Sequence, residues 1–587
     1  MNTKLRLPPE LEYSPLSGED MAPLAHEDRT WSMWDMTAIW IGMAVCIPTY
    51  LLASNMIRSG LSWEASLLII ALANLVITIP MVLSGHAGVK YGIPFPVFGR
   101  ASFGTHGVHL AALVRGIIAC GWFGIQTWIG GLAFYSIWNV ITGQTGTVGL
   151  DVGKFVGFGV FWVMNIYFIW RGTESIKWLE NYSAPILLLI GVVLIGWGYN
   201  NAGSFSGVLE QGRQLQMTTA SLQAPESNPG DYTLSVSLVT DIDGNAKASE
   251  MNIWIPTEDG TVDLGWMDVT SDKFSVEVPY SELYSTGIEP VLVQFRSEEA
   301  ALSSILSVSP EIFDDERPSI WIYLIWFTAM VGFWATMAIS IADITRLSKN
   351  QSDQIKGQFL GLPTTMTFFS FVAIFVTSAA VVSFKDILIV EDTPWDPVSL
   401  VARFQDPVVV VFAQIALIIA TLSTNIAANV IAPANAISNI LPQKINFRVG
   451  GVIAGIIAIV TCPWWLMDDL ASILVFVSGL LGPVLGILLC DYFLIRKKEL
   501  ALFDLYKPNG MYAFGGSGFN KAAMYALAAG VLTALIGFWI PSLSFLYSLS
   551  WFTGFGVAFA LYYYLMKNAP IRPSEVTDNK PVNFKKV

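Results

Sequence analysis

Runs of about 20 apolar residues follow one another along most of this 587-residue chain, and no other feature limits its fold as strongly. Each run is long enough to cross a bilayer as a helix, whereas the strands of a membrane barrel are shorter and alternate. Only 13% of the residues are charged, against about 25% in an average soluble protein. The sequence therefore predicts an all-α polytopic membrane protein.

We expect twelve spans, with predicted residues 34–57, 64–84, 107–139, 155–172, 181–199, 320–345, 359–384, 404–434, 447–466, 470–495, 522–540 and 543–566. The loops on the N-terminal side of the membrane carry most of the basic residues, namely Lys90, Arg100, Arg171, Lys177, Arg346, Lys349, Lys356, Lys444, Arg448, Arg496, Lys497 and Lys498. The short loops on the other side carry only Arg58, Lys154, Lys385 and Arg403. Because basic loops stay inside, both termini are predicted to be cytoplasmic, and the protein to lie in the cell membrane.

One stretch, residues 201–319, interrupts the apolar pattern and is called the insert below. Residues 201–320 carry 20 acidic and 5 basic residues, and the rest of the chain has a net charge of only +2. Apolar residues such as Leu234, Val236 and Leu238 alternate with polar ones, which is typical of half-buried strands. We predict a small all-β domain, sandwich-like and extracytoplasmic. It is either a spacer or assembly module, with a possible protein partner, or a sensing or solute-capturing domain.

The predicted organisation is a cytoplasmic N-terminal tail at 1–33, helices one to five at 34–200, the insert at 201–319, helices six to ten at 320–496, helices eleven and twelve at 497–567, and a cytoplasmic C-terminal tail at 568–587. No cleavable signal peptide is expected, because the first apolar run begins too late and is too long. The acidic balance of the chain argues against binding to nucleic acid, whose phosphates would be repelled.

Two spans contain residues that interrupt a helix. Pro48 in span one has no N–H, so the carbonyl of Ala44 loses its helical donor, and Gly42 adds flexibility. Span six has Gly332 and Trp334 at its middle. Unpaired carbonyls are tolerated in a membrane where they line a cavity or hold an ion, so matching breaks in two five-helix halves point to a midplane site. The alternative is a simple kink at Pro48 and close packing at Gly332.

Span eight concentrates hydroxyls and amides at Ser423, Thr424, Asn425 and Asn429. Buried polar groups are costly unless they have partners. Hydroxyl oxygens are hard donors that suit a small cation such as sodium. The alternative is that these side chains join neighbouring helices, as small and hydroxyl residues often do in membranes.

Span three places Trp122 and Gln126 four residues apart, and therefore on one helix face. An indole beside an amide can stack on a flat heterocycle and hydrogen-bond to it. The alternative is a tryptophan in the protein core or at the membrane interface.

No carboxylate or histidine lies in the middle of a predicted span. This pattern favours a cation held by neutral oxygens over a proton relay. The sequence also has no nucleophile, metal cluster or acid–base pair of the kind that a membrane enzyme needs, and no phosphate-binding loop. We therefore expect neither catalysis nor an organic cofactor.

Several longer stretches form a recognisable set: Gly85-His86-Ala87-Gly88, Tyr91 to Phe98, Arg100 to Gly104, Trp122 to Trp128, Ser423-Thr424-Asn425 with Ala427-Ala428-Asn429, Leu481-Gly482-Pro483 and Asp491-Tyr492-Phe493. These stretches resemble the nucleobase–cation symporters, a family that includes hydantoin, allantoin, uracil and cytosine permeases. The resemblance covers nearly the whole chain except the insert and the termini. It implies twelve helices, of which the first ten form two inverted five-helix repeats with broken helices one and six.

The resemblance also implies a substrate site and a sodium site. In hydantoin permeases of the family, the ring is held by residues that correspond here to Trp122, Gln126 and Trp334, with Asn429 from span eight. The family's sodium ligands correspond to the carbonyls of Gly42, Val45 and Ala420 and the hydroxyls of Ser423 and Thr424. Cys46 stands where hydantoin permeases carry a glutamine, so the substrate is expected to differ, and allantoin-type and uracil-type relatives are closer.

We therefore expect a secondary active transporter that imports a nucleobase-related cyclic amide of the allantoin, hydantoin or uracil class. Transport would be symport with sodium or a proton across the lipid bilayer, by alternating access. The alternatives are a transporter of another heterocycle, such as cytosine or thiamine, and a membrane receptor that uses the insert to bind a partner.

Overall fold

The computed structural model describes residues 7–569 except 59–60, 145–148, 172–184, 187–188, 201–204, 206–207, 210–215, 224–231, 241–246, 258–259, 272, 279–290, 298–305, 309–312, 315–318, 384–396, 403, 405 and 467–469. Residues 1–6 of the predicted N-terminal tail and 570–587 of the predicted C-terminal tail therefore lie outside the described residues.

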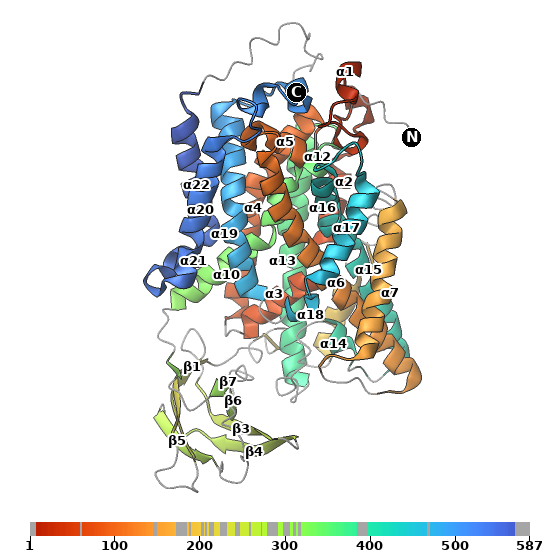
Figure 1. Ribbon diagram of the computed structural model, residues 1–587. Coiled ribbons are helices and arrows are strands. Elements are labelled where there is room, and N and C mark those ends of the chain that lie inside the picture. Colours follow the sequence, from red (N-terminus) through yellow and green to blue (C-terminus); the bar gives the residue numbers. More distant parts are fainter. Residues whose placement is uncertain are drawn as a thin grey trace.

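Long helices lie side by side in one helical body (Figure 1). The part that precedes the insert consists of α2 (Met33–Ala44), α3 (Ile47–Arg58), α4 (Trp63–Tyr91), α5 (Phe95–Phe103), α6 (Gly107–Thr142), α7 (Val152–Arg171) and an apolar helix at Leu189–Asn200. Three short helical turns precede them: α1 (Pro9–Glu12), η1 (Glu19–Met21) and η2 (His26–Asp28).

The part that follows the insert consists of α10 (Ser319–Phe333), α11 (Ala335–Ser340), α12 (Ala342–Thr345), α13 (Gln351–Ser383), α14 (Pro397–Val401), α15 (Pro407–Asn429), α16 (Ile431–Ser438), α17 (Phe447–Val460), α18 (Pro463–Leu466), α19 (Leu470–Leu489) and η3 (Cys490–Ile495). The chain ends with η4 (Leu502–Tyr506), η5 (Met511–Ala513), α20 (Lys521–Trp539), η6 (Pro541–Leu543), α21 (Ser544–Ser548) and α22 (Ser550–Met566).

The predicted all-α membrane body agrees with the length and composition of these helices. Among the described residues, eight helices are long and apolar enough to cross a membrane, or ten if each of two bent pairs is one span. The bent pairs are α2 with α3, at 55°, and η6–α21 with α22, at 82°. Two shorter apolar helices, Leu189–Asn200 and Phe447–Val460, fall in the fifth and ninth predicted spans.

Glycines of α4 allow the two parts of the chain to approach closely. A Cβ atom on Gly88 would lie 2.9 Å from the carbonyl oxygen of Ala342 in α12. On the same face of α4, the carbonyl of Gly85 accepts a hydrogen bond from Thr345 Oγ1, at 2.9 Å. The Gly85-His86-Ala87-Gly88 stretch is therefore a helix-packing motif in this fold.

The insert contains two four-stranded antiparallel sheets. Its strands are β1 (Gln216–Gln223), β2 (Tyr232–Thr240), β3 (Glu250–Thr257), β4 (Gly260–Asp268), β5 (Lys273–Val278), β6 (Val291–Arg296), β7 (Leu306–Val308) and β8 (Phe313–Asp314), in the orders β5-β2-β1-β8 and β4-β3-β6-β7. Leu234 and Val236 from the first sheet share one buried cluster with Ile253 and Val293 from the second. The two sheets therefore pack face to face, as in a sandwich.

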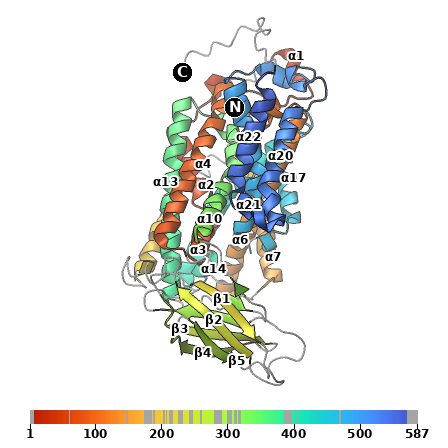
Figure 2. The same ribbon diagram turned by 90° about the vertical axis from the view of Figure 1, so that its left-hand side faces the viewer.

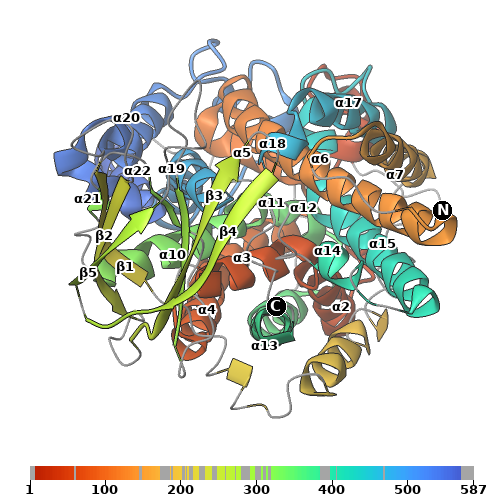
Figure 3. The same ribbon diagram turned by 90° about the horizontal axis from the view of Figure 1, so that it is seen from below.

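The strands lie beyond one end of the helical body (Figures 1 and 2). Seen from that end, they overlie the side formed by α10, α19 and α22, and they leave α7 and α15 uncovered (Figure 3). The segment of α1 and the end of α22 lie at the opposite end of the helices (Figure 1).

The described part of the predicted N-terminal tail, residues 7–32, is packed against the helices. The carbonyl of Met21 accepts a hydrogen bond from Tyr506 Oη, at 2.7 Å, and Met21 itself is 1% exposed. Gln443 Nε2 donates to the carbonyl of Ser17, at 2.9 Å. Arg29 donates to the carbonyl of Val89 at the end of α4, and burial lowers the pKa of its guanidinium to about 10.

Candidate functional site

The first predicted helix break lies between α2 and α3. The amide of Val45 still donates to the carbonyl of Ile41, at 3.1 Å, but the amide of Cys46 donates to the carbonyl of Ala44, at 3.0 Å. Pro48 has no N–H for that carbonyl, so Cys46 supplies the hydrogen bond instead and turns the chain. The helical partner of the Gly42 carbonyl is thereby lost, because in a regular helix Cys46 would donate to it.

The second break lies at Trp334, between α10 and α11. Its backbone angles, φ −98° and ψ 3°, depart from those of a helix. Gly332 lies inside α10 and contacts α19, where a Cβ atom would overlap Ser478 Oγ and lie 3.0 Å from the carbonyl oxygen of Leu474. Gly332 therefore serves close packing, which was its alternative interpretation, and the interruption belongs to Trp334.

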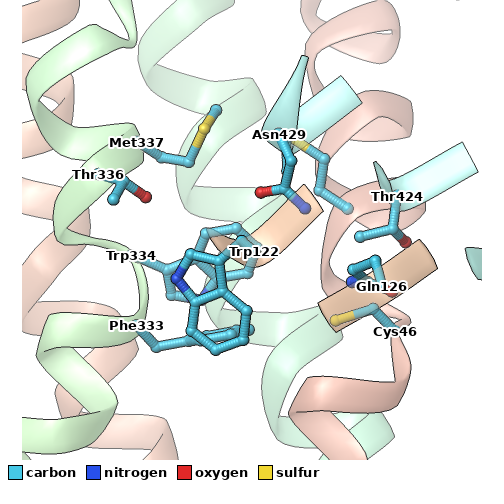
Figure 4. A pocket seen from close by; sticks show the side chains of 11 residues that line it. Cys46, Trp122, Gln126, Phe333, Trp334, Thr336, Met337, Thr424 and Asn429 are labelled. Atoms are coloured by element: carbon cyan, nitrogen blue, oxygen red, sulfur yellow. The ribbon is translucent and has the colours of Figure 1, made fainter. Parts of the chain in front are cut away.

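A pocket lies between the two breaks and is shown in Figure 4. The side chains that line it are Met43, Cys46, Trp122, Gln126, Phe333, Trp334, Thr336, Met337, Thr424, Ala428 and Asn429. Its cavity has a volume of about 20 Å³, which is room for one water molecule. The side chains must therefore move apart before a heterocyclic ring can enter.

All five residues that the sequence predicts for substrate contact line this pocket: Cys46, Trp122, Gln126, Trp334 and Asn429. They come from the break between α2 and α3, from α6, from the break between α10 and α11, and from α15, and only folding brings them together. Sequence reasoning missed Met43, Phe333, Thr336, Met337 and Ala428. These five residues could have been found from the sequence, because they lie within a few positions of the two breaks or of Asn429.

Aromatic rings form one wall of the pocket. The rings of Trp122 and Phe333 meet edge to face, with centroids 5.4 Å apart and planes at 79°. Trp334 contacts Phe333 at 4.9 Å and Trp40 at 5.3 Å, also edge to face. Rings packed at these angles, edge against face, hold one another in place along the wall of the pocket.

Two buried polar atoms at the pocket have no hydrogen-bond partner among the described residues: Gln126 Oε1 and Trp334 Nε1. One is an acceptor and the other a donor. Leaving such an atom unsatisfied costs about 1–3 kcal/mol. The pocket is therefore suited to a ligand that supplies one N–H and one oxygen or nitrogen acceptor.

The residues predicted for a cation converge in part. Thr424 Oγ1 donates to the carbonyl of Gly42, at 2.9 Å, so a hydroxyl of α15 replaces the helical donor that Gly42 lost. Val45 follows directly after α2, and Ala420 and Ser423 lie within one turn of Thr424 on α15. These donors are neutral oxygens, a set that fits a hard monovalent cation.

A charged residue that sequence reasoning missed, Arg115, lies inside the predicted third span. It precedes Trp122 by seven residues, or about 10 Å along α6, and it is 1% exposed. Its Nε donates to the carbonyl of Thr336, at 3.1 Å, and its Nη2 contacts Met337 Sδ, at 3.5 Å. Arg115 therefore supports the pocket wall just beyond the second break. An arginine within an apolar run was the signal available for it.

The family model for permeases of cytosine/purines, uracil, thiamine and allantoin matches residues 23–233 and 298–554. The unmatched residues between these ranges contain most of the strands of the insert. The allantoin permease of Bacillus subtilis is 33% identical over 565 residues, covering 94% of each chain. The purine-uracil permease NCS1 of Arabidopsis thaliana is 32% identical, covering 90% of this chain and 73% of the relative.

Among solved structures, the fold resembles that of Mhp1, a nucleobase-cation-symport-1 family transporter, in a closed conformation with bromovinylhydantoin bound. The TM-score is 0.66 at 21% identity, covering 94% of this chain and 95% of Mhp1. The match to the family model extends over both parts of the helical body, and that to the Bacillus relative over nearly the whole chain. The chain is thus a multi-pass membrane transporter, and it belongs to the nucleobase–cation symporter family.

Proposed function

We propose that this protein imports a cyclic amide of the allantoin, hydantoin or uracil class together with a cation, by alternating access. The observation that carries the proposal is the pocket between the two helix breaks, where Trp122 and Trp334 stand beside the amides of Gln126 and Asn429. The Bacillus subtilis relative bears the name allantoin permease and the Arabidopsis thaliana relative the name purine-uracil permease. Both names are consistent with a flat ring that carries several amide groups.

The ring would stack on Trp122, and its amide groups would satisfy Gln126 Oε1 and Trp334 Nε1. These atoms have no hydrogen-bond partner among the described residues, so binding would recover the free energy that their burial costs. Cys46 takes part as a small side chain at the edge of the pocket, where it is less bulky than the glutamine of hydantoin permeases.

Sodium is proposed as the co-transported ion, with Gly42, Val45 and Ala420 donating carbonyl oxygens and Ser423 and Thr424 hydroxyl oxygens. The hydrogen bond from Thr424 to Gly42 supports this proposal, because it places oxygens of α15 and of the interrupted first helix side by side. Binding there would tie the two elements together and so favour the conformation that holds the ring. Coupling to a proton is the competing possibility.

Twelve spans, with the first ten arranged as two inverted repeats, complete the proposal. The termini would be cytoplasmic and the insert, residues 201–319, extracytoplasmic. The distribution of basic loop residues supports this orientation. The strands and the described N-terminal segment also lie at opposite ends of the helices (Figure 1).

The test is ligand-induced thermal stabilisation of the purified protein by allantoin, hydantoin, uracil, cytosine and thiamine, with and without sodium. A ligand that binds only the folded state raises its stability. We expect the largest shift from a cyclic amide, and a larger one in sodium. The proposed substrate class is wrong if only cytosine or thiamine stabilises the protein. A thermal shift that is the same with and without sodium favours coupling to a proton.

Uptake by variants tests the site itself. Trp122→Ala and Gln126→Ala are expected to abolish uptake while the protein still reaches the membrane. Trp138→Ala is the matched control, because Trp138 lies on the same helix but is 61% exposed, facing away from the pocket. Normal uptake by both pocket variants would refute the assignment.

A further inference from the structure

A chain of three buried amides leads from α7 to the pocket and begins at Asn165. This side chain is fully buried, and its Nδ2 donates to the carbonyl of Phe161 one turn earlier, at 2.8 Å. A backbone carbonyl accepts and never donates, so the nitrogen end of the Asn165 amide is fixed. Its oxygen end is therefore directed at the next amide, Asn425, whose Nδ2 lies 3.1 Å away.

Asn425 on α15 is fixed in the same way by other acceptors. Its Nδ2 lies 3.3 Å from the carbonyl oxygen of Phe123 and 3.2 Å from Thr127 Oγ1. Thr127 uses its own hydrogen on the Phe123 carbonyl, at 2.6 Å, so its oxygen can only accept from Asn425. With the nitrogen end held by three acceptors, Asn425 Oδ1 must accept, and it does so from Asn429 Nδ2, at 3.1 Å.

Asn429 is the last amide of the chain and lines the pocket. Because its nitrogen end is directed at Asn425, its carbonyl oxygen is left for a ligand. In Figure 4 this oxygen lies on the side of Thr336 and Met337, and the nitrogen on the side of Thr424. Gln126 Oε1 is a second acceptor at the pocket without a partner among the described residues. The pocket therefore offers two carbonyl oxygens that call for N–H donors.

We infer that Asn165 and Asn425 are positioning residues that fix the polarity of the Asn429 amide and thereby select ring N–H donors. Cyclic imides and ureides, such as uracil, present an N–H between carbonyl groups. An aminopyrimidine such as cytosine presents an unprotonated ring nitrogen at the equivalent place, which would face the Asn429 oxygen. The inference rests on the proposed function and deepens it by naming the group that is recognised.

The experiment measures the dissociation constants of uracil and cytosine for the full-length purified protein. Wild type is expected to prefer uracil. In Asn425→Leu, the side-chain amide of Asn429 can rotate by half a turn. The dissociation constant of cytosine divided by that of uracil is therefore expected to fall about tenfold, the effect of one hydrogen bond. Asn165→Leu should act in the same direction but less strongly, because Asn425 keeps Phe123 and Thr127 as acceptors.

Two further variants distinguish the effect of hydrogen-bond direction from the effect of changing a buried side chain. Asn165→Asp should keep the wild-type ratio, since a protonated carboxyl group can still donate to Phe161 and accept from Asn425. Asn74→Leu is the matched control, because Asn74 is also fully buried and donates one turn back, to the carbonyl of Ile70 at 2.7 Å, but on α4 away from the pocket lining. It should leave the ratio unchanged.

The inference is overturned if wild type prefers cytosine, or if Asn425→Leu and Asn165→Leu weaken both ligands by the same factor. Either result leaves transport of nucleobase-related rings standing. Failure of wild type to bind any cyclic amide would instead overturn the proposed substrate class, and the inference with it. Should Asn425→Leu not fold, Asn165→Leu and Asn165→Asp still decide the question, because they leave α15 unchanged.

Discussion

At the scale of single residues, Thr424 replaces a hydrogen-bond donor that the first interrupted helix has lost. The carbonyl of Gly42 would accept from Cys46 in a regular helix, but Cys46 donates to Ala44, and Thr424 Oγ1 donates to Gly42 instead. One hydroxyl therefore joins α15 to the break. The proposed cation site depends on that junction.

Thr424→Ala is expected to raise the sodium concentration for half-maximal uptake about tenfold, because it removes one oxygen near a charge. The measurement is radiolabelled substrate uptake over a range of sodium concentrations. Thr78→Ala is the control, since Thr78 donates one turn back on α4 to Asn74. Equal sodium curves for wild type and Thr424→Ala would exclude this hydroxyl from the cation site.

The sequence predicted a pocket residue only where its side chain is of a kind that is uncommon in a membrane span. Trp122 with Gln126, and Thr424 with Asn429, stand out as polar or flat groups in apolar runs. Phe333 does not, because a phenylalanine in a span usually faces lipid or the core. Its place in the pocket wall depends on the direction that the chain takes at Trp334, which tertiary packing decides.

At the scale of elements, α10 and α19 are packed so closely at Gly332 that no side chain fits between them. Gly332→Ala would place a methyl group on Ser478 Oγ. Overpacking of this kind costs about 1–3 kcal/mol. We expect a lower midpoint of thermal unfolding, and partial recovery in the double variant Gly332→Ala with Ser478→Gly.

Gly159→Ala on α7 is the control for this experiment, because no atom of the described residues outside its own stretch of helix lies within 4 Å of the added Cβ. Alanine is the better helix former by about 0.5–1 kcal/mol, so this variant should match or exceed the wild-type midpoint. Unfolding midpoints measured in one detergent decide the comparison. A Gly332→Ala protein as stable as wild type would show that α10 and α19 can separate at no cost.

The two helix breaks differ in how far the sequence reveals them. Pro48 removes a donor, which is a local chemical fact, and the chain does turn at residues 45 and 46. The second break has no proline, and the sequence indicates Gly332 and Trp334 alike, although only Trp334 interrupts the helix. It forms where Trp334 packs against Trp40 and Phe333, and those contacts are not visible in a local pattern.

At the scale of the whole molecule, the insert is attached through neighbouring strands. β1 and β8, its first and last strands, pair through Thr219 with Asp314 and Ala220 with Phe313. The first and last strands of the insert thus lie side by side. An addition with this geometry can be removed without pulling the helices apart.

Replacing residues 216–314 with a short Gly/Ser linker is therefore expected to leave substrate uptake and ligand-induced stabilisation unchanged. All eight strands must be removed together, because β8 alone would leave an unpaired edge. Uptake into cells that express equal amounts of each protein is the measurement. Loss of uptake by a correctly folded deletion variant would favour a receptor or solute-capturing role for the insert.

The alternation of apolar residues in 201–319 predicted strands, and two sheets with a shared core are present. Their pairing order could not be predicted, since it depends on contacts between strands far apart in sequence. The packing of residues 7–32 was not predicted either. That segment has several prolines and no helical periodicity, and it is held mainly by hydrogen bonds to distant loops.

The packed N-terminal segment also bears on the order of assembly. It is synthesised before the helices, yet its partners include Gln443 and Tyr506, which follow more than 400 residues later. The hydrogen bond between Tyr506 and Met21 cannot form until η4 has been synthesised, so this part of the docking belongs to the last steps of folding. Protection of residues 7–32 from an added protease would therefore distinguish a chain whose η4 has folded from one that is still being inserted.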